Sequence, residues 1–304
     1  MKLVSFKIKD SGVQTIGVFA LEHYFDLVAL SDGELPGDMN AFLDSGTGAM
    51  DKAQSLLADS NSDRFAYTED QIQLLAPVPH AGKIMHTSCN FDAHLDELTN
   101  WQAPEWQDHG WGDFHFEHPT GFLEAPSSIV ASGEGIKIPR FTEQLDFEIE
   151  VGIVIGKTAK CVSEQEALDH VAGLMIFNDI SARDIQAREH ANKVILLGKS
   201  FDGSCPFGPW LVTLDEIGNV DDLDMKLRLN GEVRQSSNTS KTHYKIRELV
   251  SWWSEMTLHP GDIITTGSPP GVISGMENPE WLKPGDLIEA TVEKLGTLVT
   301  PIIE

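Results

Sequence analysis

The sequence predicts a mixed α+β protein that is mainly β, with a rolled or barrel-like sheet and a small N-terminal α+β domain. Short β-rich runs separated by Gly, Pro, Asn and Asp dominate the chain from about residue 76 onward. These runs do not alternate with helices in a βαβα rhythm, which disfavours a doubly wound parallel sheet. A chain of 304 residues with 41% hydrophobic content is also long enough to bury a sizeable core.

Residues 1–75 are predicted to form the small N-terminal domain. Strands are expected around Leu3–Ile8 and Thr15–Ala20, where apolar and polar residues alternate, and a helix is expected over Ala41–Ala58. After a polar segment, the run LLAPVPHAGKIM supplies prolines and a Gly-Lys before an apolar strand, which is typical of a linker. We therefore place the boundary near Leu75–Lys83 and assign residues 76–304 to the large domain.

The large domain is predicted from its β-rich runs, which are EIEVGIVIG, VAGLMIFND, MKLRLNGEVRQ, GDIITTG and GDLIEATVEKLGTLVTPI. Asn230 and Gly231 stand between two alternating runs, and this pair is a strong signal for a type I′ hairpin. Helices are predicted over Glu164–His170 and Ile246–Met256, and a third is predicted just after Asp179.

The charge of the chain argues against two classes of partner. Lys and Arg number 22 against 47 Asp and Glu, a net charge of −25 that repels nucleic-acid phosphates and anionic lipid. An anionic substrate therefore needs a local cation.

No apolar run approaches the roughly 18 residues of a membrane span, and the N-terminus does not have the pattern of a signal peptide. Cys89, Cys161 and Cys205 show no paired spacing, so a cytoplasmic location is expected.

A run of alternating carboxylates is the sharpest feature of the sequence. Because side chains on a strand alternate, Asp146, Glu148 and Glu150 are predicted to share one face. Neighbouring carboxylates raise one another's pKa unless a cation lies between them, and Mg²⁺ and Mn²⁺ prefer oxygen ligands. The alternative is a solvated strand face with its charges outward. The strand by itself does not decide between the two.

Three other segments carry weaker signals. Asp179, at a junction between strand and helix, is either a helix cap or a third oxygen ligand, and Arg183 one turn later is suited to a bidentate contact with a substrate carboxylate. Lys199 lies in GKSFD, although a lone Lys is usually a surface residue. The strand that ends in Thr266–Ser268 offers hydroxyls and backbone N–H groups to an oxyanion, although the preceding Pro-Gly-Asp is usually only a turn.

By their identity and their order along the chain, the motifs of this sequence resemble those of the fumarylacetoacetate hydrolase family. The resemblance covers residues 83–303. The motifs that carry it are KIMHTSCNFDAHLDE, LDFEIEVGIVIGK, NDISARDIQ, GKSFD, LNGEVRQ and LHPGDIITTGSPPGV. The resemblance implies that Glu148, Glu150 and Asp179 hold Mg²⁺ or Mn²⁺, with Ca²⁺ as an alternative ion. It also implies substrate contacts from Arg183, Gln186, Thr266, Gly267 and Ser268, and a homodimer.

The resemblance further implies that His94, Glu97 and Lys199 are catalytic, with His94 and Glu97 as a dyad that activates water. Residues at i and i+3 lie on the same helix face, so Glu97 is able to orient the imidazole and stabilise its protonated form. The alternative is an exposed helix histidine with no role.

The implied activity is hydrolysis of a carbon–carbon bond in a small 2,4-dioxo acid, such as an acylpyruvate or fumarylpyruvate, through a metal-stabilised enolate. The same core supports decarboxylation or tautomerisation of oxaloacetate, isomerisation of a dienedioate, or a ureidoglycolate-type lyase reaction. The small anionic 2-oxo acid would be the partner, and nucleic acid and membrane would not.

The chain departs from the family pattern at two places. Glu124 stands where many members have a Lys, which supports a non-enzymatic alternative, a metal-stabilised scaffold whose site has drifted. The segment Trp101–His118 is long and rich in aromatic and acidic residues, and it is interpreted as a lid or as an interface loop.

Overall fold

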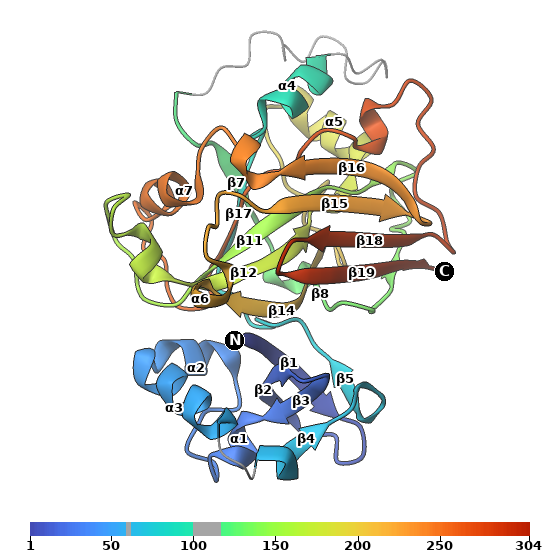
Figure 1. The fold of residues 1–304 in the computed structure, drawn as a ribbon. Helices are drawn as coiled ribbons and strands as arrows, with labels where there is room; N and C mark the ends of the chain where they lie inside the picture. Colours follow the sequence, from blue (N-terminus) through green and yellow to red (C-terminus); the bar gives the residue numbers. More distant parts are fainter. Residues whose placement is uncertain (59–61, 100–116) are drawn as a thin grey trace.

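The structure is a computed structural model that describes residues 1–58, 62–99 and 117–304. A twelve-stranded sheet runs through the molecule (Figure 1). In spatial order its main path is β4 (Ala66–Tyr67), β3 (His23–Asp26), β2 (Gln14–Ala20), β1 (Lys2–Ile8), β14 (Cys205–Thr213), β12 (Val171–Asn178), β11 (Ile149–Ile155), β17 (Ile263–Thr265), β6 (Ile84–Thr87) and β7 (Gly121–Glu124). Beside this path, β5 (Ile72–Leu74) pairs with β1, and β8 (Ile129–Val130) pairs with β14.

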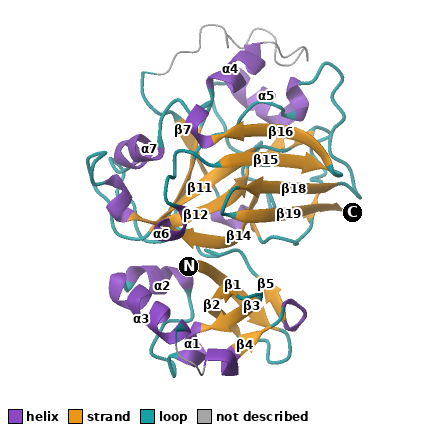
Figure 2. Cartoon of the chain, viewed as in Figure 1, coloured by secondary structure: helices purple, strands orange, loops and turns teal. Residues whose placement is uncertain are grey.

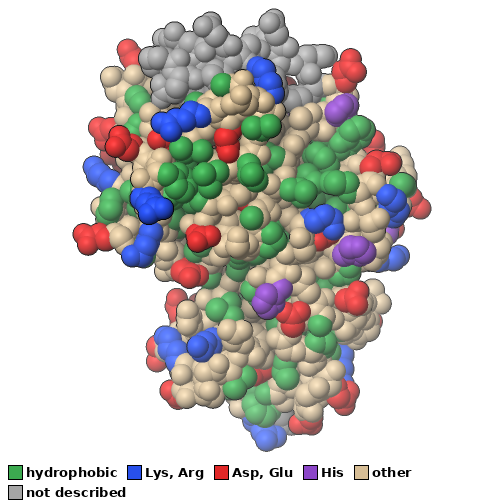
Figure 3. All heavy atoms as spheres, turned by 180° about the vertical axis from the view of Figure 1, so that it is seen from behind, with side chains coloured by type: hydrophobic (Ala, Val, Ile, Leu, Met, Phe, Trp, Pro, Cys, Tyr) green, Lys and Arg blue, Asp and Glu red, His purple; other side chains and the backbone are tan. Residues whose placement is uncertain are grey.

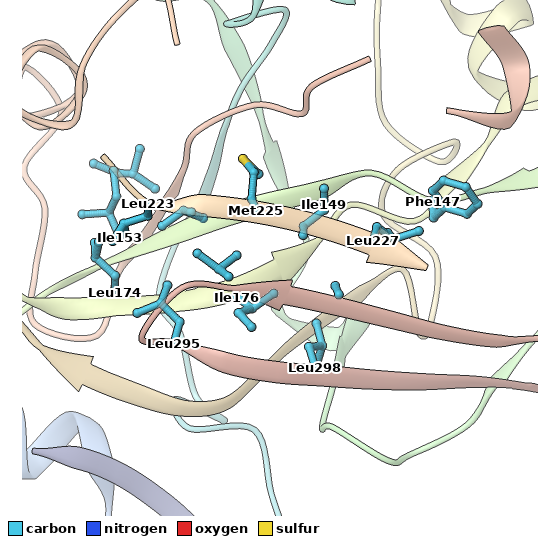
Figure 4. Packing of buried hydrophobic residues seen from close by; sticks show 14 of the residues in the cluster. Phe147, Ile149, Ile153, Leu174, Ile176, Leu223, Met225, Leu227, Leu295 and Leu298 are labelled. Atoms are coloured by element: carbon cyan, nitrogen blue, oxygen red, sulfur yellow. The ribbon is translucent and has the colours of Figure 1, made fainter. Parts of the chain in front are cut away.

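A second sheet covers one face of the large one in the C-terminal region. Its strands are β16 (Glu232–Asn238), β15 (Asp224–Leu229), β18 (Leu287–Val292), β19 (Gly296–Ile303) and β9 (Ile136–Lys137). Figure 4 shows the core between the two sheets, where Ile149 and Ile176 lie opposite Met225 and Leu298. Every residue of β11 is buried, because both faces of the large sheet are covered there.

The mixed, mainly β character is confirmed, but the rolled or barrel-like closure is not. Among the described residues the main path of the large sheet is open, with β4 at one end and β7 at the other, and no closed barrel forms. The Asn230-Gly231 hairpin is confirmed. Both residues have positive φ, 52° and 84°, as a type I′ turn requires, and they join β15 to β16.

The helices differ from their predicted bounds. The helix expected over Ala41–Ala58 is two helices, α2 (Met39–Asp44) and α3 (Thr47–Leu57). They are separated at Gly46, whose φ of 71° no regular helix contains. Over Glu164–His170 only a short 3₁₀ turn forms, at its C-terminal end. Three helices of the large region are α4 (Asp92–Thr99), α5 (Arg183–Ala191) and α7 (Ile246–Trp253). Figure 2 shows that these three lie outside the two sheets.

The N-terminal region forms the lower lobe in Figure 1, with β1–β5, α1 (Leu27–Leu30), α2 and α3. It shares both its sheet and a hydrophobic core with the rest of the chain. β1 pairs with β14 at Leu3 and Leu211, and one core cluster joins Leu3 and Phe42 to Phe177. The division into residues 1–75 and 76–304 therefore stays a prediction, because the large sheet crosses it.

The surface carries charge of both signs. On the face seen in Figure 3, acidic, basic and hydrophobic side chains are interspersed over both lobes. Within residues 1–58, 62–99 and 117–304, none of the helices combines the length and the apolar character that a bilayer crossing demands.

Candidate active site

The ends of four neighbouring strands meet at one edge of the large sheet. β11 runs antiparallel to β12 and β17, and β17 runs parallel to β6, so the start of β11 and the ends of the other three coincide. A cavity of about 490 Å³ opens at this edge. Helices α4 and α5, neighbours at the top of Figure 1, also line it. All the predicted site residues except Glu97 and Thr266 line this cavity, although they come from distant parts of the sequence.

The carboxylates predicted to lie on one face are only partly together. Glu148 and Glu150 line the cavity, as does Asp179, but Asp146 lies outside its lining. Asp146 belongs to the short strand β10 (Leu145–Asp146), and the interruption before β11 breaks the alternation. Asp146, Glu148 and Glu150 are exposed by only 0%, 6% and 2%, so the solvated strand face is wrong.

Two buried cations hold part of this negative charge. Arg183 donates from Nε to Asp146 Oδ2 at 2.8 Å and from Nη2 to Glu148 Oε1 at 2.6 Å. Its Nη1 donates to Gln186 Oε1 at 3.0 Å. Lys199 Nζ bridges Glu148 Oε2 at 2.5 Å and Asp179 Oδ2 at 2.6 Å. Arg183 thus holds the protein's own acceptors with at least three donors, and its predicted contact with a substrate carboxylate stays a prediction.

The two glutamates differ in how their charge is balanced. Burial alone would raise the pKa of Glu148, but the Arg183 and Lys199 charges outweigh it and hold that pKa far below its usual range. For Glu150, burial and the neighbouring Asp179 carboxylate raise the pKa to about 8. Burial would lower the pKa of Lys199, but the Asp179 and Glu148 carboxylates raise it. The protein's cations therefore balance the charge of Glu148, whereas the surroundings of Glu150 disfavour its charged form.

A divalent cation beside Glu150 would favour its charged form. His86, Glu150 and Asp179 each offer a ligand atom, and the three atoms lie within 4.8 Å of one another. Asp179 Oδ1 is buried and has no hydrogen-bond partner among the described residues, which is costly unless a cation or water contacts it. Asp179 does not cap α5, whose N-cap is Ala182, so the helix-cap interpretation is wrong. Glu148 is not a member of this cluster, and its role as a ligand stays a prediction.

Sequence reasoning did not single out His86. It lies in the motif KIMHTSCNFDAHLDE, within an apolar strand, but no spacing relates it to carboxylates more than sixty residues later. Its ring stacks on Phe122, with centroids 4.6 Å apart, and meets Phe177 edge-on at 5.2 Å. Only the pairing of β6 with β7 and β17 brings it to the carboxylates.

Glu124 is the partner of His86. It is buried, and its Oε2 lies 2.7 Å from His86 Nε2. Its Oε1 accepts hydrogen bonds from Ser128 Oγ at 2.9 Å and Ser204 Oγ at 2.6 Å. The carboxylate is thus fully partnered, and the negative charge at this position complements a buried histidine.

His94 and Glu97 lie on α4 and meet as predicted. His94 Nδ1 is 2.9 Å from Glu97 Oε2, and Glu97 Oε1 accepts from the Gly271 N–H at 2.9 Å. His94 is only 5% exposed, so the exposed helix histidine is wrong. Since Nδ1 donates to a carboxylate, Nε2 is left as the nitrogen that faces the cavity, 3.8 Å from Glu148 Oε1. This is the arrangement of an oriented proton acceptor.

The Thr266–Ser268 loop positions Glu150. The Gly267 N–H donates to Glu150 Oε2 at 2.8 Å, and Thr266 Oγ1 accepts from the Val151 N–H at 3.0 Å. Gly267 has a φ of 78°, and a Cβ there would meet Thr87 O at 2.8 Å, so glycine is required. Because its N–H is used in this way, the contact of this loop with an oxyanion stays a prediction.

The aromatic segment Trp101–His118 lies outside the described residues except at its end. Residues 101–116 are not described, and His118 stacks on Trp252 with ring centroids 4.5 Å apart. Both interpretations of the segment, as lid or as interface loop, stay hypotheses.

Comparison with known sequences identifies relatives across the whole chain. The family model described as "Fumarylacetoacetate (FAA) hydrolase C-terminal" matches residues 83–303. A curated oxaloacetate tautomerase of Xenopus laevis is 36% identical over 306 residues, which span 100% of this chain and 90% of that protein. That relative is named as mitochondrial, so the cytoplasmic location stays a prediction.

Solved structures agree with the fold. A fumarylacetoacetate hydrolase from Exiguobacterium antarcticum superposes with a TM-score of 0.80 at 32% identity, covering 100% of this chain and 99% of that one. A maleylpyruvate hydrolase from Sphingobium, solved with manganese(II) and pyruvate, superposes with a TM-score of 0.76 at 25% identity, with coverage of 100% and 99%.

Proposed function

This chain belongs to the fumarylacetoacetate hydrolase family, and within that family we propose that it is a divalent-metal-dependent tautomerase, which interconverts the keto and enol forms of oxaloacetate or a closely related 2-oxo acid. The observation that carries the proposal is the position of His94. Its Nε2 faces a cavity that is also lined by three carboxylates and two buried cations. The tautomerase among the relatives supports this alternative over the predicted carbon–carbon hydrolase.

The chain's own residues supply the proton transfer. His94 Nε2 accepts a proton from C3 of the keto form, and Glu97 stabilises the resulting imidazolium through Nδ1. The imidazolium then returns that proton to the C2 oxygen, so no net proton is consumed. Lys199 lines the cavity and its positive charge favours negative charge developing on the substrate oxygen.

The cavity also selects for a small anionic acid. Glu150 and Asp179 would hold a divalent cation, which would supply Lewis-acid polarisation of the 2-oxo group when bound. Leu98 and Phe122 add apolar side chains to the lining of the cavity.

The test is to follow ketonisation of freshly dissolved enol-oxaloacetate by its ultraviolet absorbance. We expect Mn²⁺-loaded protein to accelerate the decay and chelator-treated protein to lose that acceleration. A His94→Gln variant that retains Mn²⁺ is the matched control and should be slow. Equal rates for the loaded wild-type protein and a protein-free Mn²⁺ solution would contradict the proposal.

Hydrolysis of a 2,4-dioxo acid is the second candidate, since the His94–Glu97 dyad is equally suited to activate water. The maleylpyruvate hydrolase neighbour supports it. Release of pyruvate from an acylpyruvate, measured beside the enol assay, separates the two. Pyruvate release faster than ketonisation would favour the hydrolase.

A further inference from the structure

His86 is a histidine whose surroundings fix both of its ring nitrogens. It is 1% exposed, and its ring is held between the Phe122 and Phe177 rings. Rotation of the imidazole would break the stacked contact with Phe122 and the pair with Glu124 together. The orientation of the ring is therefore set by packing before any ligand arrives.

The two nitrogens have different partners. Nε2 lies 2.7 Å from Glu124 Oε2, and that carboxylate is itself held by two serine hydroxyls. Nδ1 points the other way, 3.3 Å from Asp179 Oδ2 and 3.5 Å from Thr265 Oγ1. An imidazole that gives one N–H to a carboxylate presents its other nitrogen as a more basic ligand, an arrangement common at protein metal sites.

Nδ1 also has suitable neighbours for a shared cation. Together with one oxygen each from Glu150 and Asp179, His86 forms a buried cluster of ligand atoms within 4.8 Å of one another. Asp179 Oδ1 is unpartnered among the described residues. Glu148, by contrast, has one oxygen on Arg183 and the other on Lys199.

We propose that His86 Nδ1 is a direct ligand of the cation, in a mixed nitrogen and oxygen site with Glu150 and Asp179, and that Glu124 positions His86. The inference rests on the proposed function only in requiring a divalent cation in this cavity. An imidazole ligand favours transition-metal ions such as Mn²⁺, Fe²⁺ or Co²⁺ over Mg²⁺ and Ca²⁺. The pairing with Glu124 then gives a role to the carboxylate at a position where many family members have a lysine.

In the alternative, His86 makes the same contacts but does not bind the metal. In that account His86 carries protons on both nitrogens and bridges Glu124 and Asp179 as a positioning residue. A proton and a metal ion compete for the lone pair of Nδ1, so a measurement of nitrogen coordination separates the two accounts.

The experiment is electron spin echo envelope modulation on the full chain loaded with Mn²⁺. We expect ¹⁴N modulation from a coordinated imidazole in the wild-type protein, which requires no substitution. The modulation should vanish in His86→Gln and persist in His94→Gln, the matched control from the same cavity. Absence of nitrogen modulation in the wild-type protein, failure to bind Mn²⁺, or persistence in His86→Gln would each overturn the proposal.

A second arm avoids any change at residue 86, in case His86→Gln does not fold. In the His94→Gln/His190→Gln protein labelled with ¹⁵N-histidine, the ¹⁴N pattern should be replaced by a ¹⁵N pattern. Both of those histidines line the cavity, whereas His86 is the histidine in the described cluster with Glu150 and Asp179. A ¹⁴N pattern that survives labelling would exclude histidine as the ligand.

Calorimetry tests the role of Glu124. We expect Glu124→Gln to weaken Mn²⁺ binding by about 10–100-fold, as is typical when a partner that orients a metal ligand is altered, and to weaken Mg²⁺ binding less. Equal losses for both ions would contradict nitrogen ligation.

None of these measurements uses substrate, so the two proposals can fail separately. Nitrogen coupling without ketonisation would reject only the proposed function. Ketonisation without nitrogen coupling would reject only this inference.

Discussion

The N-terminal lobe and the cavity edge of the large sheet bury polar side chains in different ways. In the N-terminal lobe, Asp26 is buried at the start of α1 and accepts from the Val28 and Ala29 N–H groups and the Thr15 hydroxyl. These partners are all neutral, and they lie in β2 and in the first turn of α1. At the cavity, Glu148 is held by the cations Arg183 and Lys199, which come from separate segments.

The difference shows which buried charges serve stability and which serve a ligand. Asp26 Oδ1 accepts three hydrogen bonds from neutral groups, and two of them cap α1. Glu150 and Asp179 are less well balanced, because Lys199 is shared between Asp179 and Glu148, the pKa of Glu150 is raised, and Asp179 Oδ1 has no hydrogen-bond partner among the described residues. Buried charge left in excess destabilises a fold, so the cavity is organised for a bound cation and not for stability.

The largest expected effect is at Asp179. Asp179→Asn removes a charged ligand, so we expect ketonisation to fall to the background rate. Mn²⁺ affinity should fall by more than the ~100-fold typical of residues that only orient a ligand. Calorimetry and the enol assay measure both. Asp26→Asn is the matched control at another buried aspartate. A loss of Mn²⁺ affinity in Asp26→Asn as large as in Asp179→Asn would contradict the distinction between the N-terminal lobe and the cavity.

The next effect is at His94, which belongs to the cavity but not to the metal cluster. We expect His94→Gln to reduce turnover by ~10²–10⁴-fold, the range for loss of a general base. Mn²⁺ affinity should be unchanged by calorimetry. Undiminished turnover would remove the dyad from the mechanism, whereas a parallel loss of Mn²⁺ would place His94 among the ligands.

A third prediction concerns Asp146, which is buried near the cavity but holds only protein groups. Besides Arg183, it accepts from the Ile273 and Ser274 N–H groups. Asp146→Asn leaves Arg183 partly unpaired, and we expect a loss of ~3–5 kcal/mol in the free energy of unfolding. Urea denaturation measures it. A stability equal to that of the wild type would show that Arg183 is balanced by Glu148 alone.

The smallest effect is at Asp26 in the N-terminal lobe. Asp26→Ala removes the N-cap of α1, and we expect a loss of about 1 kcal/mol in the free energy of unfolding. Ketonisation and Mn²⁺ affinity should match the wild type. A change in Mn²⁺ affinity would mean that the two regions are coupled through the sheet that they share.

The sequence by itself determined the local features and the chemical types of the site residues. Alternation and turn chemistry predicted β1, β2 and the Asn230-Gly231 hairpin, because these depend on neighbouring residues. Motif order predicted the family, and the i, i+3 spacing predicted the contact of His94 with Glu97.

Only the tertiary structure decided how distant residues combine. Whether a carboxylate faces a cation, a metal site or solvent depends on strand pairing and on interruptions such as the one between β10 and β11. The removal of Asp146 from the cavity and the arrival of His86 beside Asp179 both follow from such pairing. The open path of the sheet likewise depends on which strands end without partners, and no local sequence pattern specifies a partner that is tens of residues away.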